Sequence, residues 1–199
     1  PRQAIEAGAD LVTFSCDKLL GGPQAGILVG RRDLIQKIKK NPLKRVLRVG
    51  KITLAGLEAV LRLYRNPDTL PQRLAVLQLL TRAEGEMQAQ AERLRPQLQA
   101  AVTACGLSLK TQSVKSQIGS GSLPVERLPS VALAIEAQSK VHEKNVVRLE
   151  RLLRASATAV IGRLSEKTLL LDLRCLTLDK EKVLVEHMLA ALGRLEAAR

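Results

Sequence analysis

Two short apolar runs lie near the start of the chain, at 9–15 and 25–30. Runs of this length that are rich in β-branched residues are typical of strands buried on both faces, as in parallel sheets. The segment between them, 16–24, is polar and glycine-rich, which indicates a loop. We therefore expect the chain to begin with a buried strand, a loop at its end and a second buried strand.

Helical spacing of apolar residues follows. It predicts a helix over 31–40, which ends before Pro42 because the residue preceding a proline is pushed out of the helical region. Thr53 is predicted to cap a second helix, which ends before Pro67. A longer apolar stripe then continues over 68–105. This stripe predicts a long helix that connects two parts of the chain.

The pattern changes at residue 107. We predict strands at 107–114, 130–136, 158–164 and 168–175, with helices near 142–155 and 179–197. Such alternation of strands and helices is typical of a small α/β domain. The predicted organisation is 1–66 as part of a large domain, 67–106 as a connecting long helix, and 107–199 as a small C-terminal α/β domain.

Charge and aromatic content bear on the class of partner. The formal net charge of +13 favours polyanionic partners such as RNA. Aromatic residues make up 1% of the chain, Phe14 and Tyr64 alone. A stacking platform for single-stranded nucleic acid cannot be built from two rings.

Three widely spaced cysteines and two histidines fit neither a disulfide framework nor a zinc site, so no metal site is predicted. The sequence contains no apolar run long enough to cross a membrane and no signal-peptide pattern at its start. We expect a soluble, cytoplasmic protein. Because the chain begins at Pro1 without Met, we also expect its natural N-terminus to lie upstream.

The loop 16–24 carries the candidate chemistry. Lys18 follows the first predicted strand directly, beside Asp17 and ahead of Gly21 and Gly22. Ligand sites in open α/β sheets lie at such strand ends. From the residues alone, a lone lysine at such a place is more often a solvated loop charge, and Gly-Gly-Pro a simple turn.

Residues 14–26, Phe-Ser-Cys-Asp-Lys-Leu-Leu-Gly-Gly-Pro-Gln-Ala-Gly, resemble the cofactor-lysine signature of bacterial L-seryl-tRNA(Sec) selenium transferases, the selenocysteine synthases. Three later stretches, 42–45, 116–124 and 171–176, resemble the same family in the same order. One departure is Cys16, which stands where the family usually has glycine. A slightly less pliable loop is expected from it.

The resemblance implies an α/β fold, the C-terminal part of a fold-type I pyridoxal-phosphate-dependent transferase. It implies that Lys18 holds pyridoxal 5'-phosphate as a Schiff base and acts as base at the substrate α-carbon. The implied reaction converts seryl-tRNA(Sec) to selenocysteinyl-tRNA(Sec) with selenophosphate, through an aminoacrylyl intermediate. It further implies a homo-oligomer, a ring of dimers with shared active sites. Most residues that cradle the cofactor would precede Pro1, so the isolated chain is expected to be inactive.

Further roles follow from the resemblance and from general chemistry. Ser15 and the backbone amides of Gly21 and Gly22 are candidates for binding the cofactor phosphate. Asp17 is a candidate for biasing Lys18 toward its charged form or assisting proton transfer. The alternatives are a strand-end serine without a role, a simple turn and a loop-capping aspartate.

Two arginines, Arg45 and Arg48, are the candidates for binding the selenophosphate anion. They are three residues apart, so they share one face if that stretch is helical, and together they would clamp an anion. The alternative is an ordinary basic surface, since several lysines are close by. Arg174, at a predicted strand end, is ambiguous.

The run 119–122, Gly-Ser-Gly-Ser, lacks the Gly-Lys-Ser/Thr ending of a nucleotide-binding loop, and the resemblance instead implies that it borders the active site. Two alternatives to the selenium transferase stay open. One is another lyase of the same fold, such as an ammonia-lyase acting on a phosphorylated amino sugar acid. The other is a non-catalytic basic module for RNA binding or assembly.

Overall fold

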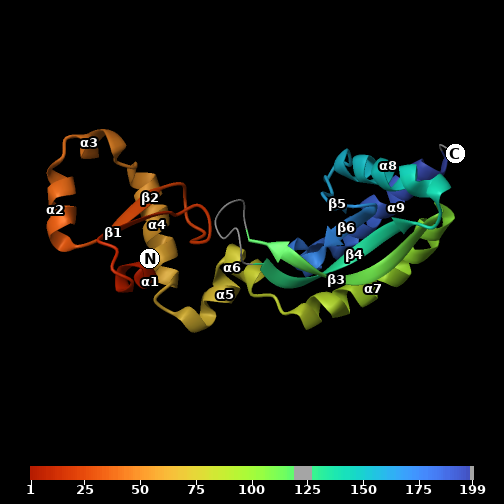
Figure 1. The fold of residues 1–199 in the computed structure, drawn as a ribbon, viewed down its shortest axis with the longest axis horizontal. Helices are drawn as coiled ribbons and strands as arrows, with labels where there is room; N and C mark the ends of the chain where they lie inside the picture. Colours follow the sequence, from red (N-terminus) through yellow and green to blue (C-terminus); the bar gives the residue numbers. More distant parts are fainter. Residues whose placement is uncertain (119–126, 198–199) are drawn as a thin grey trace. The chain divides into compact units, whose positions relative to one another are not determined.

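The computed structural model describes residues 1–118 and 127–197. Contacts between residues group the chain into two compact units, 1–81 and 82–199, and each unit is described by itself (Figure 1).

A two-stranded antiparallel hairpin forms the centre of the first unit. Helix α1 (Arg2–Glu6) precedes strand β1 (Leu11–Ser15), which pairs with β2 (Gly26–Gly30) so that Ser15 lies opposite Gly26. The prediction of strands buried on both faces is wrong for this chain: Ile27 and Val29 are half-buried, whereas Leu28 between them is exposed. Only one face of a lone strand pair is covered here, so alternate side chains face solvent.

Three helices continue the first unit. Helix α2 (Arg32–Lys40) confirms the prediction, and Asn41 turns to extended backbone before Pro42. A short helix α3 (Leu43–Leu47) follows, and then α4 (Lys51–Leu63). The predicted cap is wrong by three residues: α4 begins after Gly50, which has extended backbone, so Thr53 lies inside the first turn.

The segment 67–106 is not one connecting helix. It contains the 3-10 turn η1 (Pro67–Thr69) and three helices, α5 (Leu70–Arg73), α6 (Ala75–Leu80) and α7 (Glu84–Ala104). Extended backbone at Leu74 separates α5 from α6, while Pro96 lies inside α7 without ending it. Helix α7 belongs to the second unit.

A four-stranded antiparallel sheet organises the second unit, in the order β3-β4-β6-β5. The strands are β3 (Leu107–Gln117), β4 (Arg127–Ala137), β5 (Arg163–Ser165) and β6 (Thr168–Asp172). The strand expected at 158–164 is shorter and begins later than predicted. Short 3-10 turns lie at η2 (Lys140–His142), η3 (Leu173–Cys175) and η4 (Leu178–Lys180).

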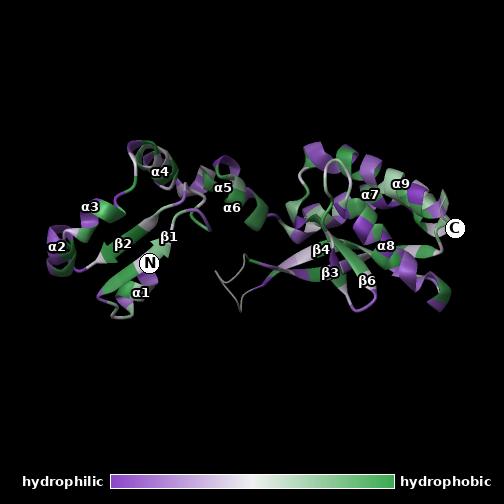
Figure 2. Ribbon diagram, turned by 90° about the horizontal axis from the view of Figure 1, so that it is seen from above, coloured by the Kyte–Doolittle hydropathy of each residue, from purple (hydrophilic) through white to green (hydrophobic). Residues whose placement is uncertain are grey.

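Helices α7, α8 (Glu143–Arg154) and α9 (Glu181–Ala197) pack with one face of this sheet in a single core. Side chains along β4 point alternately to the two faces of the sheet, and this alternation decides which of them enter the core. Val131, Leu133 and Ile135 lie in the core with the helices, while Ala132 and Ala134 lie in a small cluster on the other face. Figure 2 shows the helices of this unit as mixed purple and green ribbons, as expected of helices with one buried side.

Within the described residues, no helix is both long and apolar enough to cross a membrane. The same residues contain no group of three or more His, Cys, Asp or Glu side chains that could hold a metal ion.

Candidate active site

The loop that carries Lys18 connects β1 to β2 and is closed by its own backbone. The amide of Cys16 donates to the carbonyl of Ala25 at 2.9 Å, and the amide of Gly22 donates to the carbonyl of Cys16 at 2.7 Å. The amide of Gly21 donates to the carbonyl of Lys18 at 2.9 Å, which makes residues 18–21 a tight turn. The backbone that bears Lys18 is therefore fixed by local hydrogen bonds.

The shape of this loop requires glycine at position 21 and leaves little room for a side chain at position 22. Gly21 has φ +70°, and a Cβ there would lie 2.7 Å from a Val76 methyl. A Cβ on Gly22 would lie 3.3 Å from the carbonyl oxygen of Cys16. Both glycine amides donate inside the loop, so in this conformation neither is available to an incoming phosphate.

The side chains of Ser15, Asp17 and Lys18 are exposed on the loop and at its edge. Across the described part of the chain, no hydrogen bond or ion pair engages the Lys18 ammonium. The structure thus combines a fixed backbone with an accessible amine, which is the arrangement required for covalent attachment of a carbonyl compound.

Cys16 is fully buried beneath the loop. Burial raises the pKa of its thiol, and the negative charge of neighbouring Asp17 raises it further. The thiol is held neutral and enclosed, so it is not a second nucleophile beside Lys18.

Tyr64, at the end of α4, is a residue that sequence reasoning missed as part of this loop. Its hydroxyl donates to the carbonyl of Leu20 at 3.0 Å and lies 3.5 Å from that of Leu19. The side chain is half-buried, and burial raises the pKa of the phenol. Position 64 falls within the predicted helix that ends before Pro67, and no signal in the sequence pairs it with a loop 44 residues earlier.

Arg45 and Arg48 are exposed and lie elsewhere in the first unit. Arg45 is in α3, whereas Arg48 follows that helix with extended backbone (ψ 137°), so the two do not share a helical face as predicted. In the part of the chain that the structure describes, no hydrogen bond or ion pair joins either arginine to the Lys18 loop. Together with neighbouring residues, Arg48 lines a hollow of about 410 Å³.

The loop and the arginines lie toward opposite ends of the hairpin. Loop residue Gly21 packs near Val76 of α6, whereas α2 leaves β2 at its other end and leads to α3 (Figure 1). Helix α4, with 13 residues, begins three residues after Arg48 and reaches the loop through Tyr64. At ~1.5 Å per residue this helix spans ~20 Å. The structure therefore does not bring the predicted anion clamp to Lys18 within one chain.

In the second unit, the family-like segment 171–176 meets residues 116–118, the described part of the family-like segment 116–124, at the end of β6. The carboxylate of Asp172 accepts hydrogen bonds from the hydroxyls of Ser116 at 2.5 Å and Ser130 at 2.6 Å. Arg174, only 5% exposed, donates to the carbonyls of Arg82 and Pro129. Arg174 thus serves the packing of the second unit in this structure.

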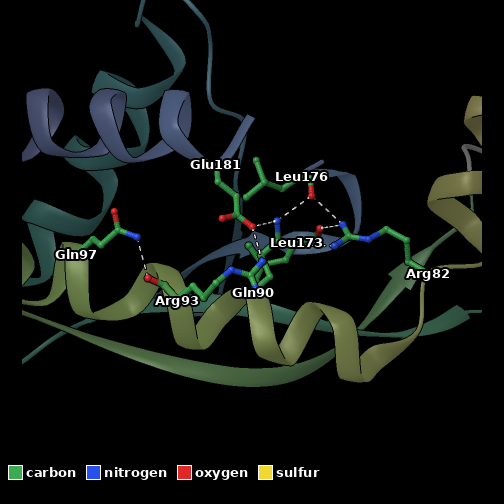
Figure 3. A network of polar contacts seen from close by, with 7 residues as sticks. All are labelled: Arg82, Gln90, Arg93, Gln97, Leu173, Leu176 and Glu181. Carbon is green, nitrogen blue, oxygen red and sulfur yellow. Dashed lines mark hydrogen bonds and ion pairs between the residues drawn. The ribbon is translucent and has the colours of Figure 1, made fainter. Parts of the chain in front are cut away.

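Arg82 is the centre of a second network (Figure 3). Its guanidinium donates to the carbonyls of Leu173 at 2.6 Å and Leu176 at 2.8 Å, and to the side-chain oxygen of Gln90 at 2.8 Å. Gln90 in turn donates to Glu181 at 3.0 Å. Burial of the guanidinium lowers the pKa of Arg82 from its ordinary value. Residues 119–122, predicted to border the active site, lie outside the described residues.

Comparison with known proteins gives the family. Residues 1–177 match the family model described as L-seryl-tRNA selenium transferase. The chain is 51% identical over 180 residues to the L-seryl-tRNA(Sec) selenium transferase of Rhizobium meliloti (strain 1021), covering 90% of this chain and 38% of that protein. It is 52% identical over 190 residues to that of Serratia proteamaculans (strain 568), covering 96% and 40%.

A solved structure of D-glucosaminate-6-phosphate ammonia-lyase matches with a TM-score of 0.56 at 18% identity, over 96% of this chain and 46% of that one. This likeness concerns the fold alone, a mixed α/β architecture. The chain spans about two fifths of the length of the curated relatives that it matches. The resemblance carried by residues 14–26 is confirmed, and the chain belongs to the L-seryl-tRNA selenium transferase family.

Proposed function

We propose that this chain is the C-terminal part of a cytoplasmic, pyridoxal-phosphate-dependent transferase that converts seryl-tRNA(Sec) to selenocysteinyl-tRNA(Sec) with selenophosphate. In this proposal residues 1–81 end the large domain of a fold-type I enzyme, and the second unit is its small domain. The observation that carries the proposal is an exposed lysine on a fixed loop within a segment matched to this family.

The residues present fit the covalent attachment of the cofactor. They do not fit the predicted contacts from the amides of Gly21 and Gly22. The Lys18 amine is accessible to an aldehyde, and the Ser15 hydroxyl is exposed nearby. Because the amides of Gly21 and Gly22 donate inside the loop, their role is to shape it. Pyridoxal phosphate, when bound, supplies the electron sink that stabilises negative charge at the substrate α-carbon.

Within this proposal, Lys18 moves the proton at the α-carbon of the seryl group. A neutral amine accepts a proton and an ammonium returns one, so a single side chain serves both directions. Asp17 is adjacent in sequence, and its side chain is exposed beside that of Lys18. The net charge of +13 suits a tRNA partner, since phosphates are neutralised by lysine and arginine.

Labelling tests the assignment of Lys18. The full-length protein that contains this chain is incubated with pyridoxal phosphate, reduced with borohydride and mapped by mass spectrometry. We expect the label on Lys18, and its loss together with seryl-tRNA turnover in Lys18→Ala. Lys37→Ala, which removes an exposed lysine of α2, is the matched control and should keep both. An unlabelled Lys18 in the wild type would refute the cofactor assignment.

We further propose that Arg45 and Arg48 bind the selenophosphate anion at the site of Lys18 from a second copy of the chain. The two copies belong to a homo-oligomer built from dimers. Two features support this. The arginines and Lys18 lie toward opposite ends of the hairpin in one chain, and the region around α3 exposes large apolar side chains. Those side chains are between 59% and 90% exposed: Leu43, Val46, Leu47 and Ile52.

Subunit mixing tests the shared site. Lys18→Ala subunits and Arg45→Ala/Arg48→Ala subunits are each expected to be inactive. If Lys18 and the arginines of one site come from different chains, half the sites in each mixed dimer are intact, and random mixing restores about one quarter of wild-type turnover. No recovery on mixing would mean that both groups act within one chain, or that the arginines act elsewhere.

An ammonia-lyase of the same fold is the alternative function. The identity of 18% to such an enzyme, against about half to the selenium transferases, favours the transferase. Assays of the full-length protein for selenophosphate-dependent turnover of seryl-tRNA, and for ammonia release from a phosphorylated amino sugar acid, distinguish the two.

A further inference from the structure

Tyr64 is the only tyrosine of the chain and contacts the loop of Lys18 from a distant part of the sequence. Its hydroxyl lies 3.0 Å from the carbonyl oxygen of Leu20 and 3.5 Å from that of Leu19. Burial raises the pKa of the phenol, so it stays protonated and able to donate throughout the neutral range.

The two carbonyls near the phenol belong to Leu19 and Leu20, the central residues of the turn that begins at Lys18. The hydrogen bond from the Gly21 amide to the Lys18 carbonyl closes this turn, and within the turn the Leu20 carbonyl accepts from the Tyr64 hydroxyl. The phenol therefore holds the Leu20–Gly21 peptide group, two residues after Lys18. No other side-chain hydrogen bond reaches residues 16–25 within the described part of the chain.

Apolar contacts hold the other side of the turn. Side-chain atoms of Val76 and Leu74 lie 2.7 and 3.1 Å from where a Cβ on Gly21 would be, and a Leu57 methyl lies 3.6 Å from the corresponding position on Gly22. Such contacts are not directional, so they restrict where the turn lies more than how its peptides are oriented. The hydrogen bond from Tyr64 supplies that orientation.

We propose that Tyr64 is a positioning residue for Lys18: its hydroxyl orients the 18–21 turn so that the lysine amine is presented in one direction. The inference rests on the proposed function for Lys18 as the group that reacts. Catalytic groups must be held within a narrow range of geometry by the residues behind them, and a misplaced backbone lowers the rate of every step that uses the amine.

The test is Tyr64→Phe in the full-length protein, because this substitution keeps the ring and removes only the hydroxyl. Loss of one hydrogen bond corresponds to a roughly 3- to 10-fold effect. We expect amide hydrogen exchange at Gly21 and Gly22 to be faster by this factor, and borohydride-trapped labelling of Lys18 by pyridoxal phosphate to be slower by a similar factor. Thr81→Val is the matched control, since it removes a hydroxyl that donates to the carbonyl of Leu77 at 2.8 Å in the same unit.

A pH profile separates positioning from a general loss of stability. Ionisation removes the donor from the wild type as well, but only above the raised pKa of the phenol, which lies above the ordinary tyrosine value of about 10. The ratio of wild-type to Tyr64→Phe labelling rates should therefore fall toward one as pH rises through the raised pKa of the phenol, while the lysine titration cancels in the ratio.

The outcomes distinguish this inference from the proposed function. If wild-type Lys18 is labelled and Tyr64→Phe matches it in both labelling rate and amide exchange, Tyr64 has no positioning role. A slower label whose ratio does not change with pH also overturns the inference, since the hydroxyl would then not be the cause. If the wild type itself is not labelled, the assignment of Lys18 fails. The hydrogen bond from Tyr64 is then tested by amide exchange alone, and exchange at Gly21 and Gly22 that is unchanged in Tyr64→Phe would refute it.

Discussion

At the scale of single residues, the burial of the Cys16 side chain does not follow from its neighbours in the sequence. It is flanked by an exposed serine and an exposed aspartate, yet its side chain is fully buried. Its amide and carbonyl both close the Lys18 loop. The sequence predicted a less pliable loop at this position, and the structure adds that the thiol fills space beneath it.

The raised pKa of Cys16 makes the stability of the fold depend on pH. A thiol whose folded pKa lies above its unfolded value stabilises the fold fully below the unfolded value, and this contribution is lost as pH rises through the folded pKa.

At pH 8 we expect a thiol reagent to modify the exposed Cys175 rapidly and Cys16 slowly, as followed by peptide mapping. Asp17→Asn removes one cause of the raised pKa and should speed the modification of Cys16 without affecting Cys175. Equal rates at the two cysteines in the wild type would contradict the burial of Cys16.

At the scale of elements, the conformation of the loop depends on the helices packed beside it. The sequence identifies the glycine pair, but only the folded unit shows that Gly21 faces the α5–α6 corner at Leu74 and Val76. The same corner exists because the stripe predicted as one long helix is interrupted at Leu74.

Gly21→Ala tests this packing. The added Cβ combines a left-handed backbone with a contact at 2.7 Å to a Val76 methyl, so we expect the first unit to lose ~1–3 kcal/mol of stability. Hydrogen exchange of residues 1–81 measures that unit separately from the rest. Gly26→Ala is the control: a Cβ there meets nothing within 4 Å, so a change of at most about 0.5 kcal/mol is expected. Equal losses of stability in both variants would show that the backbone conformation and close packing at Gly21 do not contribute to the stability of the unit.

At the scale of the whole molecule, the chain consists of two units with different internal architecture. The second unit begins at Arg82, whose side chain holds the backbone that follows β6 (Figure 3). Its hydrogen bonds connect residues about ninety positions apart, and no short motif in the sequence marks it.

Arg82→Met is expected to destabilise the second unit by ~2–4 kcal/mol, because the carbonyls of Leu173 and Leu176 lose a charged donor. Hydrogen exchange of residues 82–197 reports the change, and residues 1–81 should be unaffected. Arg95→Met changes an exposed arginine of α7 and serves as the control. A loss of stability no greater than the control's would mean that the network contributes little.

The sequence by itself determined the family, the position of the candidate lysine and most of the elements. These follow from local information: the motif at 14–26, the proline at position 42 and the periodicity of apolar residues. The tertiary structure decided which distant groups meet. It assigned Arg174 to packing, separated Arg45 and Arg48 from Lys18 within one chain, and brought Tyr64 to the Lys18 loop. Such pairings depend on how helices and strands pack, which local propensities do not encode.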